Sequence, residues 1–247
     1  MVRFFRRLVD IVTPPKCLAC RKDVQSGASL CVTCWQKLNC LEDPVCDVLG
    51  TPFAYDQGEG ILSAAALANP PPWERARAAV VFDDAAKGLV HALKYRDQTE
   101  AGLLMARMMS RASRDLCAEA DVIMPVPLHR SRLWKRRFNQ AAFLGQRIAA
   151  EAQKPFVTDV LLRDFSTRQQ VGLNFVARQK NVKKAFSVPF EKIGLIAGKT
   201  VLLVDDVRTT GATVAACALA LKKAGASRVY IVTFALVLDP LRMHIEA

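Results

Sequence analysis

Apolar residues in the second half of the chain fall into short continuous runs that alternate with stretches of helical periodicity. The continuous runs predict strands at Ala78–Phe82, Asp121–Val126, Val160–Leu162, Val201–Val204 and Arg228–Leu238. The periodic stretches predict helices at Asp84–Arg96, Thr99–Ala118, Asn139–Ala152, Asn174–Ala185 and Gly211–Ala224, the last with Gly225 as its C-cap. Strands that alternate with helices predict an α/β fold with a parallel sheet, which binds ligands at the carboxyl ends of its strands.

The first quarter of the chain has a different pattern. Val2–Val12 gathers its apolar side chains on one helical face, which predicts a short amphipathic helix that docks onto the protein in preference to a membrane. Tyr55–Trp73, with two glycines and three consecutive prolines, is typical of a linker. We therefore expect an N-terminal helix and small module over residues 1–54, a linker over 55–76 and an α/β domain over 77–247.

Six of the eight cysteines lie within thirty residues, and four of these form two C-x2-C pairs. Cys17 and Cys20, with Cys31 and Cys34, would complete the tetrahedron of thiolates that structural zinc prefers. The segment is too short for an apolar core of its own, so we expect the metal to stabilise it. A redox dithiol pair is the alternative, although no βαβ pattern accompanies it. Cys40 and Cys46 are spaced too irregularly for a second complete site, but one of them could be a substitute ligand.

Charge and hydropathy narrow the class of protein. Apolar residues make up 51% of the chain and charged residues 23%, which excludes intrinsic disorder and a coiled coil. The net charge of +12 favours polyanionic partners such as nucleic acid or phosphorylated small molecules, with a merely solvated basic surface as the alternative. No apolar run reaches the ~18–20 residues of a membrane span. No apolar segment of a signal peptide follows the first charges, so we expect a cytoplasmic protein.

The segment with the most chemical information is VLLVDDVRTTGAT, residues 201–213. An apolar strand leads into two carboxylates, Asp205 and Asp206, and then into a hydroxyl-rich loop that opens a helix. Threonine hydroxyls and helix N-terminal amides bind phosphate oxygens, and Gly211 lets the backbone approach them. The carboxylates would repel a bare phosphate, so sugar hydroxyls or a magnesium ion suit them better. The segment predicts a sugar phosphate site; the alternative is a capped helix beside a solvated acidic pair.

This segment resembles the phosphoribosyl pyrophosphate signature of type I phosphoribosyltransferases. With CLAC, CVTC, LKYRD, PVPLHRSRLWKRRFNQ, TRQQVGL and RQKNVKKAF, the whole chain is similar to the ComF family of competence-associated, phosphoribosyltransferase-like proteins. The resemblance implies a type I phosphoribosyltransferase fold, with a parallel sheet flanked by helices and a hood, together with a small N-terminal zinc-ribbon module. Many relatives carry a third C-x2-C pair, at which this chain reads Cys46-Asp-Val-Leu49.

The resemblance also assigns roles to residues. Asp205 and Asp206 would bind the ribose hydroxyls and, with Arg130, act in catalysis. The phosphoribosyl pyrophosphate would further contact Val207, Thr209, Thr210, Gly211, Ala212 and Thr213. The pyrophosphate loop would comprise Pro127, Leu128, His129 and Arg130, with Lys94 as a second contact. The hood that excludes water would include Arg168, Gln169 and Gln170.

The implied activity is magnesium-dependent transfer of ribose-5-phosphate from phosphoribosyl pyrophosphate to an unidentified acceptor, with release of pyrophosphate, in DNA uptake or repair. Some purine-salvage members have an acidic base where this chain has Thr209. The acceptor would then need little deprotonation, as with ammonia or an anionic ring nitrogen.

Two other functions stay open. One is a regulator that senses phosphoribosyl pyrophosphate without turning it over. The other is an accessory factor that binds single-stranded DNA or a DNA-processing protein through the basic and aromatic stretch His129–Phe138. That stretch is equally typical of a pyrophosphate loop that leads into a helix. The sequence leaves the oligomeric state open as well.

Overall fold

The computed structural model of the chain describes residues 15–25, 28–56, 58, 60–95, 99–128, 138–163 and 185–238. Its longer helices are α4 (Asp84–Tyr95), α5 (Thr99–Ala112), α6 (Arg114–Glu119), α8 (Gln140–Ala152) and α10 (Ala212–Lys223). Its longer strands are β1 (Arg75–Val81), β2 (Val122–Pro125), β5 (Thr200–Arg208) and β6 (Arg228–Leu236). The smaller elements are α2 (Val32–Trp35), α3 (Ala64–Ala68), β3 (Leu162–Arg163), β4 (Phe186–Ser187) and η1 (Phe190–Leu195). The predicted helix at Val2–Val12 and nearly all of the one at Asn174–Ala185 lie outside the described residues.

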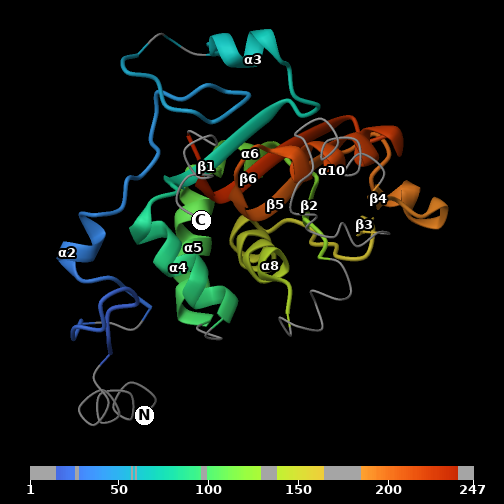
Figure 1. The fold of residues 1–247 in the computed structure, drawn as a ribbon. Helices are drawn as coiled ribbons and strands as arrows, with labels where there is room; N and C mark the ends of the chain where they lie inside the picture. The colour runs from blue at the N-terminus through green and yellow to red at the C-terminus, as the bar shows by residue number, and fades with distance from the viewer. Residues whose placement is uncertain are drawn as a thin grey trace, which may run out of the picture.

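The main sheet has the strand order β1-β6-β5-β2, and every neighbouring pair is parallel. Helices lie on both of its faces (Figure 1). The prediction of an α/β fold with a parallel sheet is therefore confirmed. Parallel strands need covered faces because their connections run over the sheet as helices.

Alternate residues of β5 pack into opposite layers. Leu202 and Val204 lie in the larger core, which α4, α5 and α8 cover, whereas Val201 and Leu203 lie in a second core under α10. All four side chains are fully buried. Because both faces of the strand are covered, its sequence is a continuous apolar run and not an alternating one.

Two predicted elements have different bounds in the structure. The helix expected over Thr99–Ala118 breaks at Ser113, whose buried hydroxyl donates to the Met109 carbonyl at 2.8 Å, so that α5 and α6 are separate. Strand β5 continues past Val204 to Arg208, because its polar end stays paired with β6 as far as Leu236. That pairing is between distant parts of the chain, so local hydrophobicity does not indicate it.

A second, small sheet stands apart from the main one. It pairs β3 with β4 in antiparallel orientation, Leu162 opposite Ser187 and Arg163 opposite Phe186. The strand expected at Val160–Leu162 thus begins two residues later, and Val160 and Leu161 are buried instead in the core under α10. The β3–β4 pair and η1 place this part of the chain beside α10 (Figure 1).

The N-terminal module covers the outer edge of the main sheet. Leu41 donates its backbone N–H to the Ala79 carbonyl at 3.0 Å, Val81 donates to the Asn39 carbonyl at 2.8 Å, and Ala76 donates to the Asp47 carbonyl at 3.0 Å. These bonds satisfy backbone groups that the edge strand β1 would otherwise expose. They also fix the module against the α/β layers.

Side chains strengthen the same junction. Asp47 of the module accepts from Arg75 at 3.0 Å and from Arg77 at 2.6 Å, both in β1. Burial opposes ionisation of Asp47, but the two guanidinium groups outweigh it and lower the pKa of the carboxyl. Within the range expected to be a linker, Ser63 caps the short helix α3 by accepting from the Ala66 N–H at 3.3 Å. No helix in the described part of the chain is both long and apolar enough to cross a membrane.

Replacement of Gly50 by alanine should destabilise the junction between the module and β1. Gly50 has φ +64°, and an added Cβ would lie 2.8 Å from the Ala76 carbonyl oxygen of β1. We expect Gly50→Ala to lower the free energy of unfolding by about 2 kcal/mol, measured by urea titration. Gly88→Ala is the matched control, since Gly88 is exposed within α4 and has open space around it. That change should stabilise the protein by roughly 0.5–1 kcal/mol; equal effects of the two changes would contradict the proposed strain.

Candidate functional site

Two strands end side by side at the carboxyl edge of the sheet. Pro125 of β2 is paired with Val204 of β5, and the Val126 N–H donates to the Val204 carbonyl at 2.8 Å. Asp205 and Asp206 follow directly on β5, while Pro127 and Leu128 follow on β2. The register therefore brings the acidic pair next to the start of the loop expected to bind pyrophosphate.

The chain around β2 is anchored by α8. Asn139 caps this helix by accepting from the Ala141 N–H at 3.0 Å, and its amide donates to the Val126 carbonyl at 3.0 Å. One side chain thus ties the end of β2 to the start of a helix that packs on β5. His129 and Arg130 lie outside the described residues, as do Arg168, Gln169 and Gln170 of the expected hood. Their assignments stay predictions.

A pocket open to solvent lies where β5 turns into α10. It is lined by Asp205, Val207, Arg208, Thr209, Thr210, Gly211, Ala212, Thr213 and Val214, and the space between them, with the solvent at its mouth, is about 240 Å³. Gly211 is the N-cap of α10, with φ 78° and ψ 0°, and makes no cap hydrogen bond because it has no side chain. The N-terminal amides of a helix left in this way, together with its dipole, favour an anion.

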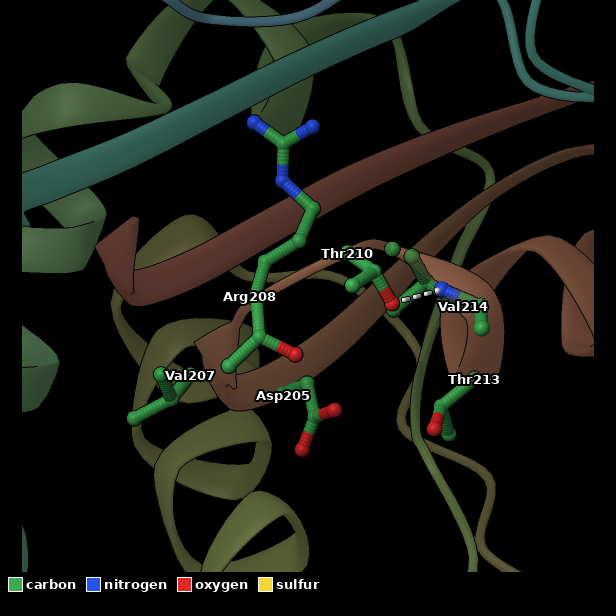
Figure 2. Close-up of a pocket in the computed structure, with 9 residues that line it drawn as sticks. Asp205, Val207, Arg208, Thr210, Thr213 and Val214 are labelled. Carbon is green, nitrogen blue, oxygen red and sulfur yellow. Dashed lines mark hydrogen bonds between the residues drawn. The ribbon is translucent and has the colours of Figure 1, made fainter. Parts of the chain in front are cut away.

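The polar groups of the pocket come from both ends of its loop. Thr210 accepts weakly from the Ala212 N–H, at 3.4 Å through its hydroxyl oxygen. Figure 2 shows Asp205 and Thr213 directing their oxygens to the same side of the loop, whereas Arg208 points away from both. Hydroxyl donors and carboxylate acceptors therefore share one pocket.

The two carboxylates are in unequal environments. Burial, and next the charge of Asp206, raise the pKa of Asp205 to about 8 although the Asp206 N–H donates to it at 2.9 Å. Asp206 itself pairs with Lys94, at the end of α4, with 2.5 Å between Oδ2 and Nζ. Lys94, expected at the diphosphate, therefore lies against the acidic pair in this structure.

Three residues of this site were not anticipated from the sequence. Arg208 and Val214 line the pocket, and Trp73 packs against Gly211 from a distant part of the chain. Arg208 and Val214 lie within or beside the recognised segment but have no hydroxyl or carboxylate to mark them. Trp73 gives no local signal because its contacts are with residues far away in sequence.

The cysteines of the N-terminal module form a candidate metal centre. The sulfurs of Cys17, Cys20, Cys31 and Cys34 all lie within 4.8 Å of one another, and those of Cys20 and Cys31 are 3.6 Å apart. A tetrahedral zinc site with Zn–S bonds of about 2.3 Å needs sulfurs about 3.8 Å apart. The four thiols thus fit a closed structural zinc site, as their spacing in the sequence predicts.

Backbone amides stabilise the thiolate form of one cysteine of this centre. Although burial disfavours the thiolate, N–H groups of Cys20, Cys31 and Ala19 lower the pKa of Cys17 to about 6. One such bond, from the Cys31 N–H to the Cys17 sulfur, measures 3.3 Å.

Cys40 and Cys46 do not join the cluster. Cys40 pairs through its backbone with Val80 of β1, and the buried Cys46 sulfur accepts from the Ser63 N–H at 3.3 Å. The alternative that one of them is a ligand of the four-cysteine centre is not supported.

Known families match both parts of the chain. A double zinc ribbon domain matches residues 8–66, and a phosphoribosyl transferase domain matches residues 139–244. The chain is 30% identical to DNA utilization protein YhgH of Salmonella typhimurium over 221 residues, 87% of each chain. It is 27% identical to competence protein F of Haemophilus influenzae over 222 residues, 87% of this chain and 94% of that one.

Among solved structures, the chain aligns with adenine phosphoribosyltransferase from Leishmania tarentolae at 15% identity. The alignment covers 67% of this chain and 80% of that one, with a TM-score of 0.37. The fold class is established by the two matched domain families, by the parallel sheet, and by the four-cysteine cluster of the N-terminal module.

The metal content should be one zinc per chain. Cys17→Ser should abolish zinc binding, because it removes a buried member of the four-sulfur cluster, and removal of the metal by a chelator should open the segment around it to protease. Cys40→Ser is the control and should retain the zinc, since its thiol lies outside the cluster. Elemental analysis of the purified chain measures both; two zinc ions per wild-type chain would contradict the assignment.

The raised pKa of Asp205 should make the protein less stable as the pH rises. The folded chain keeps this proton up to about pH 8, while the unfolded chain loses it near the ordinary value of 3.8. Unfolding then releases a proton in this range, so higher pH favours unfolding. Asp205→Asn should flatten the decline in the free energy of unfolding between about pH 5 and pH 8, measured by urea titration. Asp159→Asn, at an exposed carboxyl whose pKa Lys192 lowers, should leave that slope unchanged.

Proposed function

The chain belongs to the family of competence protein F and DNA utilization protein YhgH, and from this premise we propose that its α/β domain binds phosphoribosyl pyrophosphate together with magnesium. The bound ligand lies at the carboxyl end of β5, across the loop that opens α10. We further propose that the N-terminal residues 1–54 form the zinc module, residues 55–76 link it to the rest, and residues 77–247 form the phosphoribosyltransferase domain.

One observation carries the proposal. A single pocket combines an uncapped helix N-terminus and threonine hydroxyls, which suit a phosphate, with a carboxylate of the acidic pair, which suits hydroxyl groups. A phosphate alone would leave the acidic pair without hydroxyl partners, and a sugar alone would leave the helix N-terminus without an anion. A sugar phosphate satisfies both halves of the pocket.

Each group of residues then has a role. The 5′-phosphate binds Thr209–Thr213, and the ribose hydroxyls bind Asp205 and Asp206. The diphosphate binds the loop that follows β2, at Pro127–Arg130, with Lys94 as a further cation. Residues Arg168, Gln169 and Gln170 close over the ligand and keep water from the anomeric carbon.

Magnesium would neutralise charge on the diphosphate, and carboxylate, hydroxyl and phosphate oxygens are the hard ligands that it prefers. The proposed reaction transfers ribose-5-phosphate to an acceptor. The bond from the anomeric carbon to the diphosphate oxygen breaks, its electron pair leaves with pyrophosphate, and the acceptor's lone pair forms the new bond. Arg130 and Lys94 stabilise the charge that develops on the leaving diphosphate.

The acceptor is one that needs little deprotonation. Thr209 follows Arg208 at the end of β5, where its hydroxyl is a poor base, and the pocket's carboxylate is engaged by the backbone of its neighbour. Ammonia or an anionic ring nitrogen meets this requirement. The names of the two relatives refer to DNA utilization and to competence, and we propose a cytoplasmic role in DNA uptake or repair for this chain.

Ligand-induced stabilisation tests the binding site. Phosphoribosyl pyrophosphate with magnesium, at a hundred times its dissociation constant, should stabilise the wild-type protein by about 2.7 kcal/mol. For a chain of this size, that raises the melting temperature by roughly 5–10 °C. The double variant Asp205→Asn/Asp206→Asn should lose the shift, while Glu100→Gln, an exposed carboxylate at the start of α5, should keep it.

The same experiment separates binding from turnover. No shift in folded, zinc-loaded wild type would contradict the proposed site. A shift that the double variant loses justifies a screen of amines and ring nitrogens for pyrophosphate release. Binding without release for every acceptor would overturn the transfer step and favour the sensing function.

A further inference from the structure

The turn Cys46–Gly50 has a defined shape without belonging to the four-cysteine centre. The Gly50 N–H donates to the Cys46 carbonyl at 2.6 Å, and the Cys46 N–H donates to the Thr51 carbonyl at 2.8 Å. Cys46 is fully buried, and its sulfur accepts from the Ser63 N–H. Ala76 of β1 holds the turn from outside, through its N–H bond to Asp47. Backbone bonds and the sheet edge therefore fix this turn.

Two carbonyls of the turn accept hydrogen bonds from side chains outside the module, one just before β1 and one at the end of β5. The Trp73 indole N–H donates to the Val48 carbonyl at 2.8 Å. The Arg208 guanidinium donates to the Leu49 carbonyl and lies over the Trp73 ring, with 5.8 Å from Cζ to the ring centroid. The turn, Trp73 and Arg208 thus form one continuous stack between the N-terminal module and β5.

The stack ends on the phosphate loop. A Cβ built on Gly211 would lie 3.2 Å from Cη2 of Trp73 and 4.0 Å from Cδ of Arg208. The indole ring therefore packs against the residue whose left-handed conformation starts α10. The Arg208 guanidinium points away from Asp205 and Thr213 (Figure 2), so this stack supports the loop from the side opposite these polar groups.

Arg208 is a costly residue to place in this position. It is 6% exposed, and within the described residues its Nε has no hydrogen-bond partner. Burial lowers the pKa of its guanidinium to about 10, with the Cys46 thiol, when ionised, as an opposing charge. A buried cation with an unsatisfied donor destabilises a fold, so a role other than stability is favoured for Arg208.

We propose that Trp73 and Arg208 are positioning residues, which transmit the fixed shape of the Cys46–Gly50 turn to the phosphate loop and hold Gly211 ready for a 5′-phosphate. The N-terminal module is then part of the ligand site without touching the ligand. This inference rests on the proposed function, because its readout is the affinity for phosphoribosyl pyrophosphate.

Substitutions of Arg208 test the stack in the full-length, zinc-loaded chain. Arg208→Met keeps an unbranched apolar side chain but removes the guanidinium with its charge and donors, and it should weaken binding of phosphoribosyl pyrophosphate with magnesium roughly tenfold or more. Arg208→Lys should be intermediate, since an ammonium group can donate to the Leu49 carbonyl but cannot lie flat on the indole. Arg111→Met is the control and should bind as wild type, because Arg111 is exposed and pairs only distantly with Glu42, at 3.5 Å. Calorimetry gives the affinities; zinc content and cooperative unfolding show that each variant is folded.

Fluorescence of Trp73 provides a second readout. If the stack only stabilised the fold, this fluorescence would not respond to the ligand. The chain has three tryptophans, so Trp35→Phe/Trp134→Phe leaves Trp73 as the reporter. Its emission should change saturably with phosphoribosyl pyrophosphate and magnesium, with the dissociation constant that calorimetry gives for this same double variant. The change should disappear when Arg208→Met is added.

The outcomes distinguish this inference from the proposed function. Wild-type binding with unchanged affinity in Arg208→Met would overturn the positioning role and leave the ligand site standing. Wild-type binding with no change in Trp73 emission would overturn it as well, even if Arg208→Met failed to fold. No binding by wild type would remove the proposed function and this inference with it. Graded loss from arginine through lysine to methionine, with zinc and folding retained, supports it.

Discussion

Burial of β5 on both of its faces is the constraint that sets the position of the candidate site. Val201 and Leu203 pack under α10, and Leu202 and Val204 pack against the opposite helices. Carboxylates cannot join either apolar core without large desolvation costs, so the apolar run ends at Asp205, which lines the pocket and belongs to neither core. Because β2 ends in register with that point, the loop that follows β2 starts beside the acidic pair. The geometry of the pocket thus follows from where an apolar run ends.

The N-terminal module shows how a segment without its own core can become rigid. Four thiols gather at one point, where zinc would crosslink the two C-x2-C turns. The rest of the module is held in place by contacts with β1. These are backbone hydrogen bonds and the ion pairs of Asp47 with Arg75 and Arg77. The backbone bonds that hold the module to β1 also cover this edge strand. The two parts therefore stabilise each other, and the turn Cys46–Gly50 is held without being a metal site.

The sequence predicted the features that depend on local pattern. The apolar run and the loop residues located β5, α10 and the pocket between them, and the cysteine spacing located the four-sulfur cluster. It missed features that depend on distant partners: the extension of β5 to Arg208 requires β6, and the contact of Trp73 with Gly211 requires the whole fold. The break at Ser113 needed knowledge of which face of the helix is buried. Local propensity competes poorly with such tertiary contacts.

Two ionised carboxylates beside a phosphate loop would repel an incoming anion, and two features of the structure reduce this repulsion. Burial raises the pKa of Asp205 to about 8, which keeps this carboxyl largely neutral near pH 7, and Lys94 neutralises Asp206. An approaching anion therefore meets little local negative charge, in a chain of net charge +12. In the proposed function, ribose hydroxyls and a divalent cation would then satisfy the carboxylates in place of Lys94. Lys94, once released from Asp206, would lie next to the diphosphate. Its pairing with Asp206 in this structure is therefore compatible with the diphosphate contact predicted from the sequence.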